Sequence, residues 1–161
     1  MFLDLDLLYK IYRDYKDEKQ AKKFLRNIIK NEARLNNDIL NVIRRSNPNK
    51  VAMETPELFK QLNTNSFDLL STLGKLPSEI FNIAKEPTFD ELEQLDRASN
   101  TYHFYMNKTE VELYEFYILK SKLLISLADS SSIATTNVIL KSRINNLEYA
   151  TRILFKKLRE G

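Results

Sequence analysis

Few side chains in this sequence can do acid–base, nucleophilic or metal chemistry. His103 is the only histidine and there is no cysteine, which excludes disulfides, thiol catalysis and zinc–thiolate sites. Gly74 is the only glycine before the C-terminal residue, so no glycine-rich loop can cradle the phosphates of a nucleotide. No serine lies in a nucleophile-elbow context. We therefore expect no cofactor and no metal.

One pair of residues has a spacing that points to chemistry. Arg97 and His103 enclose Ala-Ser-Asn-Thr-Tyr. This segment resembles the Arg-x(4–6)-His signature of HEPN domains, which are all-helical bundles that often act as dimeric, metal-independent ribonucleases. The resemblance implies that Arg97 orients and neutralises the scissile phosphate, and that His103 is the general acid or base. It rests on this short segment and on the all-helical size of the chain.

The helical geometry of this pair sets a condition on that function. Six positions along a continuous helix turn two side chains about 120° apart. Arg97 and His103 would therefore meet on one phosphate only where the helix breaks, or where a second protomer contributes. The alternative is that Arg97 is a solvated or ion-paired neighbour of Glu93, and that His103 is an ordinary helix position.

The charges are unevenly distributed along the chain, although the net charge is only +3. Residues 10–50 carry twelve Lys or Arg against five acids, and residues 133–161 carry six against two. Between them, residues 86–115 carry eight acids against two basic residues. Neighbouring helices that balance each other explain this pattern, and so do two basic segments that contact nucleic-acid phosphates. The last predicted helix has a basic stripe of Lys141, Arg152, Lys156 and Arg159.

Tyrosine is the other abundant side chain with a polar end. Tyr9, Tyr12 and Tyr15 share one side of the first predicted helix, and Tyr102, Tyr105, Tyr114 and Tyr117 belong to the acidic one. Tyrosine is enriched at protein interfaces, and its ring can also stack on the bases of RNA. A third interpretation is that the rings fill the edges of a bundle with their hydroxyls in water.

The elements that position these residues are helices, because apolar residues recur at helical spacing and no segment alternates with period two. We expect an all-α antiparallel helical bundle over residues 1–161, as a single domain. Two long helices of similar length (3–45 and 89–129) suggest a hairpin, a shorter helix covers 133–159, and short helices at about 55–85 form a cap. The first helix either breaks near Lys16–Lys22 or projects toward a partner. Its apolar positions Leu25 and Ile39 keep a step of seven across Glu32.

Local signals mark several boundaries. We expect Ser66 to cap a short helix that ends at Gly74 in the left-handed conformation, and Pro77 to open a further turn. Thr109 matches a capping box, so the second long helix either breaks near Asn107 or continues through Thr109.

These observations lead to one function prediction with two alternatives. The first is a non-catalytic helical protein–protein interaction or assembly module that self-associates. The alternatives are an RNA-binding or HEPN-like ribonuclease using Arg97 and His103, and a nucleic-acid-binding subunit without sequence specificity.

The N-terminus is acidic where a signal peptide would be basic. The longest uncharged stretch, 130–140, is far shorter than the roughly 20 residues that span a bilayer. We therefore expect a cytoplasmic protein without a membrane partner.

Overall fold

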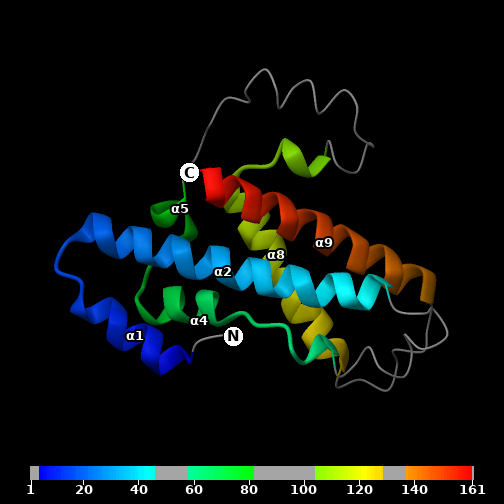
Figure 1. The fold of residues 1–161 in the computed structure, drawn as a ribbon, viewed down its shortest axis with the longest axis horizontal. Helices are drawn as coiled ribbons and strands as arrows, with labels where there is room; N and C mark the ends of the chain where they lie inside the picture. The colour runs from blue at the N-terminus through cyan, green and yellow to red at the C-terminus, as the bar shows by residue number, and fades with distance from the viewer. Residues whose placement is uncertain (1–3, 46–57, 82–103, 129–136, 161) are drawn as a thin grey trace.

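A computed structural model describes residues 4–45, 58–81, 104–128 and 137–160. Every regular element in these ranges is a helix, which confirms the all-α prediction (Figure 1). The helices are α1 (Leu5–Asp14), α2 (Glu18–Arg45), α4 (Asn65–Thr72), α5 (Pro77–Ile80), α8 (Glu110–Ala128) and α9 (Asn137–Glu160). No helix within these ranges is long and apolar enough to cross a membrane.

The single helix predicted over 3–45 is wrong, and the alternative of a break is confirmed. α1 ends at Asp14, and Tyr15 has extended backbone angles. The side chain of Asp17 then accepts a hydrogen bond from the Lys19 N–H at 2.8 Å, as an N-cap does at the start of a new helix. The rings of Tyr15 and Phe24 lie 5.1 Å apart, which helps to hold α1 folded back beside α2 (Figure 1).

The short helices of the predicted cap are present where the structure describes them. α4 begins at Asn65, so Ser66 lies inside its first turn and is not its cap. Gly74 ends this segment with φ at 64°, and Pro77 is the first residue of α5, as the sequence predicts. Residues 55–57 and 82–85 of the predicted cap lie outside the described ranges.

We expect the Gly74→Ala variant to lose about 1 kcal/mol of unfolding free energy, because alanine has to adopt the same left-handed conformation. No atom lies within 4 Å of the position that the added Cβ would take. The loss of unfolding free energy therefore measures the cost of the backbone conformation alone, without a steric clash. Urea denaturation of the two proteins measures it. A Gly74→Ala variant as stable as the original protein would contradict this assignment.

The single helix predicted over 89–129 is wrong, and the alternative of a break near Asn107 is confirmed. Phe104–Met106 is helical, and a turn at 107–109 precedes α8. Thr109 and Glu112 form the predicted capping box: Glu112 Oε2 accepts from the Thr109 N–H at 2.8 Å, and Thr109 Oγ1 accepts from the Glu112 N–H at 3.2 Å. Residues 89–103 and 133–136 of the predicted helices lie outside the described ranges.

The main packing differs from the hairpin that the sequence suggested. α2 lies antiparallel to α9 in the most extensive pairing of the fold, and α8 crosses behind both (Figure 1). α1 and α4 pack together on the other edge of α2. The core consists of apolar side chains from these helices, including Leu25, Ile29, Leu40, Leu113, Leu124, Leu147 and Leu154.

Candidate functional site

The seam between α2 and α9 brings together the two basic segments of the sequence. The Asn37 side chain of α2 donates to the backbone carbonyl of Glu148 in α9 at 3.1 Å, which fixes the register of the two helices. Lys30 and Lys23 precede Asn37 by seven and fourteen residues. Because an α-helix has 3.6 residues per turn, both lysines lie on the side of α2 that faces α9.

The matching side of α9 carries the predicted basic stripe. Arg152 and Arg159 follow Glu148 by four and eleven residues, so they lie on the same side of the helix as Glu148. The guanidinium of Arg152 lies 5.0 Å from the centre of the Tyr149 ring, and its Nε lies 3.8 Å from Glu148 Oε1. Lys141 belongs to α9, but its side chain lies outside the described set.

We call the combined surface the basic seam. It consists of Lys23, Lys30 and Arg34 of α2 with Arg152, Lys156 and Arg159 of α9. Sequence reasoning singled out the three α9 members, but not the three from α2. The excess of basic residues over 10–50 was the available signal, yet only the pairing of α2 with α9 places those residues beside the C-terminal stripe.

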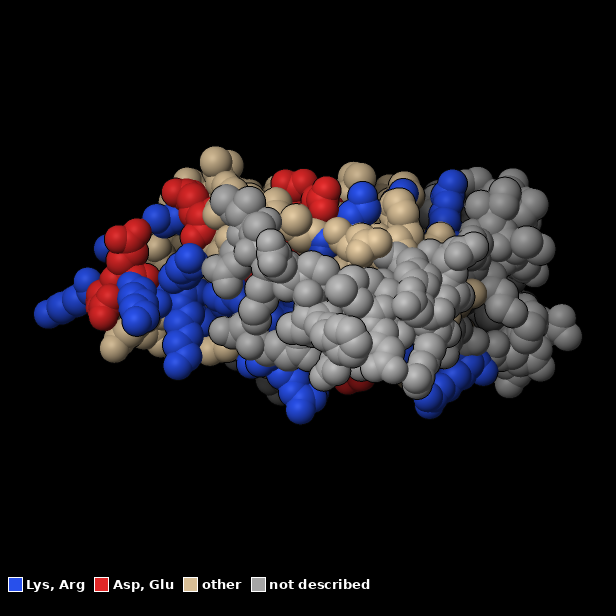
Figure 2. All heavy atoms as spheres, turned by 90° about the horizontal axis from the view of Figure 1, so that it is seen from above, with Lys and Arg blue, Asp and Glu red and all other residues tan. Residues whose placement is uncertain are grey.

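Four of the six basic residues of the seam have no matching acid among the described residues, whereas Arg152 lies within ion-pair distance of Glu148. Among the described residues, no carboxylate lies within ion-pair distance of Lys23, Lys30, Arg34 or Arg159. Glu148 lies on the seam, but it is only 1% exposed. Figure 2 shows Lys and Arg side chains projecting along the lower edge of the view, which is the side where α2 and α9 lie in front of α8 in Figure 1.

The predicted electrostatic balance between helices is realised at a different place. Arg26 of α2 forms a two-pronged, partly buried ion pair with Glu110 of α8, at 2.9 and 3.4 Å. The same guanidinium donates to the Ile80 carbonyl at 3.2 Å. This pair joins a basic segment to the acidic one, whereas the basic seam joins two basic segments.

The residues of the predicted ribonuclease pair, Arg97 and His103, lie outside the described ranges. The tyrosines of α1 are placed: Tyr9 and Tyr12 are half-buried against the core, and Tyr15 is exposed. The Arg13 guanidinium lies 5.7 Å from the centre of the Tyr9 ring. α1 therefore offers Tyr15, but no row of exposed rings.

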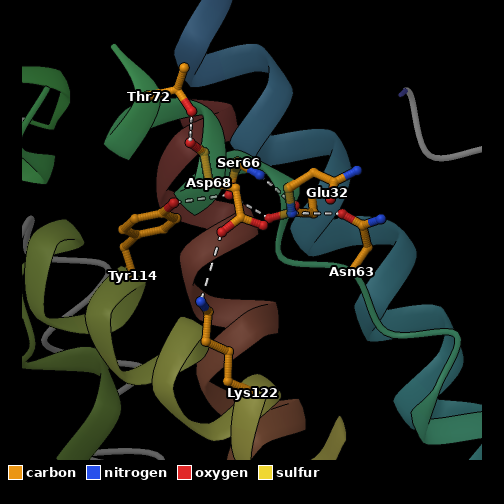
Figure 3. Close-up of polar contacts among 8 residues, drawn as sticks. Glu32, Asn63, Ser66, Asp68, Thr72, Tyr114 and Lys122 are labelled. Atoms are coloured by element: carbon orange, nitrogen blue, oxygen red, sulfur yellow. Dashed lines mark hydrogen bonds and ion pairs between the residues drawn. The ribbon is translucent and has the colours of Figure 1, made fainter. Parts of the chain in front are cut away.

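Tyr114 and Tyr117 do not have their hydroxyls in water, as the third interpretation expected, but in a buried polar cluster. Figure 3 shows the Tyr114 hydroxyl pointing toward Ser66 in this cluster. Its centre is the carboxylate of Glu32, which accepts from the Ser66 N–H at 2.9 Å, the Ser66 hydroxyl at 2.6 Å and the Tyr117 hydroxyl at 3.0 Å. The Tyr114 hydroxyl lies 2.9 Å from Ser66 Oγ.

A second layer of hydrogen bonds closes this cluster. The Asn36 side chain donates to the Asn63 carbonyl at 2.7 Å and to the Tyr117 hydroxyl, and it accepts from the Asn63 N–H at 2.9 Å. Glu32 and Asn36 of α2 thereby hold the start of α4 and the middle of α8 together. Sequence reasoning missed the cluster, although Glu32 on the apolar step of seven was a signal for it.

Burial dominates the electrostatics of this cluster. It raises the pKa of Glu32 from 4.5 to about 7, against the lowering effect of the hydrogen bonds from Ser66 and Tyr117. Burial also raises the pKa of the Tyr114 and Tyr117 hydroxyls, and the neighbouring Glu32 carboxylate adds to the effect. These side chains are at most 5% exposed, so the cluster is placed to hold the fold together, not to touch a substrate.

Within the described ranges, no group of three His, Cys, Asp or Glu side chains is arranged to hold a metal ion. In comparisons with known proteins, no family model, no curated protein and no solved structure matches the chain.

Proposed function

We propose that the protein is a non-catalytic helical module that binds the phosphate backbone of nucleic acid through the basic seam. The observation that carries this proposal is the side-by-side placement of two sequence-distant basic segments on one face. Several of their charges have no carboxylate partner among the described residues.

Like charges that lie close together repel one another and lower the stability of a fold. The basic seam places lysines and arginines of α2 beside arginines of α9, so apart from the contact of Arg152 with Glu148 its charges repel one another and do not favour folding. A bound polyanion would remove this repulsion and release its own condensed counterions. Local arrangements that oppose folding are typical of functional surfaces.

The size of the basic seam suits a nucleic-acid backbone. From Lys23 to Arg34, α2 rises by about 17 Å at 1.5 Å per residue. Phosphates of one strand of a duplex are spaced about 3.4 Å apart along its axis, so the seam spans roughly five of them. Side chains that contact phosphates alone carry no sequence information, and we therefore infer binding without sequence specificity.

The salt dependence of binding tests this proposal. If all six side chains of the seam contact phosphates, the logarithm of the binding constant falls against the logarithm of salt concentration with a slope of about −5 for duplex DNA, and about −4 for a single strand. Fluorescence anisotropy with a labelled RNA and a labelled duplex, between about 50 and about 200 mM salt, measures these slopes. Absence of binding at the lower salt concentration would contradict the proposal.

The ribonuclease alternative can be tested on the same samples. Incubation of RNA with the protein in EDTA, followed by a denaturing gel, reveals cleavage. Cleavage that is lost in His103→Ala would support a site at Arg97 and His103, and it would exclude the non-catalytic proposal. RNA that is bound but remains intact supports the non-catalytic module.

Self-association, the first prediction from the sequence, is a second candidate function. α8 exposes two leucines one turn apart: Leu119 is 65% exposed and Leu123 is 37% exposed. The same patch on two copies can form a twofold interface. Light scattering on the protein and on the Leu119→Lys, Leu123→Lys double variant tests it: a dimer that dissociates in the variant supports this surface, and a monomeric original protein excludes it.

A further inference from the structure

The buried cluster around Glu32 joins three helices through one carboxylate. Ser66 is the second residue of α4, and the preceding Thr64 makes no side-chain hydrogen bond to the helix start. The first N–H groups of a helix lack partners within the helix. Glu32 of α2 accepts one of them, from Ser66, and also accepts the Tyr117 hydroxyl of α8. It is therefore the cap of α4, supplied by another helix.

The groups that face Glu32 offer it hydrogen bonds but no positive charge. From α4, the charged group is Asp68, whose own partner is Lys122 of α8 at 3.8 Å (Figure 3). From α8, the titratable groups are Tyr114 and Tyr117. No lysine or arginine of the described residues forms an ion pair with Glu32. A buried carboxylate without a cation is unfavourable in its ionised form.

The neighbouring hydroxyls let this carboxyl group hold a proton without losing a hydrogen bond. The Tyr117 hydroxyl lies 3.0 Å from Glu32 Oε2 and 3.2 Å from the Asn63 carbonyl oxygen. When Glu32 is ionised, Tyr117 donates to it. When Glu32 is protonated, its O–H donates to the Tyr117 oxygen, and Tyr117 turns its own proton to the Asn63 carbonyl.

We propose that Glu32, Ser66, Tyr114 and Tyr117 form a proton-operated lock on α4. Protonated Glu32 holds the first turn of α4 against α2 and α8, and loss of the proton loosens it. α1 packs against α4, so the α1–α4 layer loosens from the rest of the bundle together with the lock.

The direction of the pH dependence follows from linkage. Burial raises the pKa of Glu32 in the closed state to about 7, from 4.5 where the group is exposed. The closed state therefore binds the proton more tightly than the open state. Below pH 4.5 the stability of the closed state relative to the open state is at its full value. This stability falls as pH rises from 4.5 to about 7, and it stays constant above about 7, where Glu32 is ionised in both states. Between pH 6 and pH 8, the open population rises by about tenfold.

Hydrogen exchange of the α4 amides tests the lock. Exchange rates, divided by the intrinsic rate at each pH, are compared for the original protein and for Glu32→Gln between pH 5 and pH 8. We expect α4 protection to fall in the original protein and to stay level in Glu32→Gln, because glutamine keeps the acceptor and has no proton to lose. A parallel fall in both proteins would overturn the proposal.

A direct titration keeps the test valid if Glu32→Gln does not fold. The carboxyl carbon shift of Glu32 reports its protonation in the original protein, in Ser66→Ala and in Tyr114→Phe. We expect a midpoint near neutral pH that rises further in Ser66→Ala, which removes a hydroxyl donor to the carboxylate. Tyr114→Phe is the matched control with a smaller shift, because its hydroxyl bonds to Ser66 and not to Glu32. An ordinary acidic midpoint in the original protein would contradict the lock.

Discussion

Reversal of three charges on the basic seam is expected to weaken nucleic-acid binding by about a hundredfold or more at low salt. The variant is Lys30→Glu, Arg34→Glu and Arg159→Glu. None of these side chains has a carboxylate partner among the described residues, so the reversals break no ion pair that the structure shows. The salt slope should also shrink by about three, because each phosphate contact contributes nearly one.

A matched triple variant separates the surface from the net charge. Lys10→Glu, Lys75→Glu and Lys120→Glu change the net charge by the same amount, on α1, the connection after α4, and α8. We expect anisotropy titrations of this control to remain within a few-fold of the original protein. Equal losses in both triple variants would mean that total charge attracts the polyanion, and would refute a binding face on α2 and α9.

The largest stability effect is expected for Asn36→Ala. Asn36 is fully buried, and its side chain satisfies both the N–H and the carbonyl of Asn63 and also contacts the Tyr117 hydroxyl. Alanine removes all three hydrogen bonds, leaves the Asn63 N–H without this acceptor and opens a small cavity, while the Asn63 carbonyl and the Tyr117 hydroxyl keep their contact with each other. We expect a loss of about 3 kcal/mol in unfolding free energy, measured by urea denaturation.

Asn41→Ala is the control for this loss. It makes the same substitution in the same helix, but Asn41 is half-buried and donates to the Asn37 side chain at 3.0 Å. We expect a loss below about 1 kcal/mol. Similar losses in both variants would show that helix α2 responds to any such truncation, and that the hydrogen bonds to Asn63 carry no special weight.

The sequence predicted those parts of the fold that depend on neighbouring residues. Proline at the first position of a helix, glycine at its end and a Thr-x-x-Glu capping box act within one turn. Pro77, Gly74 and Thr109 are therefore found in their predicted roles. The break between α1 and α2 is also local, since Asp17 starts a new helix, but helix propensity through the charged run left open whether the helix breaks there.

The pairing of helices and the candidate site depend on contacts far apart in the sequence. Nothing near Lys30 or Arg34 in the sequence shows that α9 lies beside them, and the extensive packing of α2 against α9, with the contact from Asn37 to Glu148, reveals it. The same holds for Tyr117. Its sequence context predicts an ordinary tyrosine of an acidic helix, and only the structure shows that its hydroxyl donates to Glu32. Helical periodicity shows which side of a helix is buried, but not which helix covers it.

Photo-crosslinking of RNA to the protein, followed by mass spectrometry of the linked peptides, tests the central claim most directly. The binding proposal predicts crosslinks at 23–34 of α2 and 149–159 of α9, which decrease as salt is raised. Crosslinks at the exposed leucines of α8, or crosslinks spread evenly over all helices, would contradict a binding surface on the basic seam.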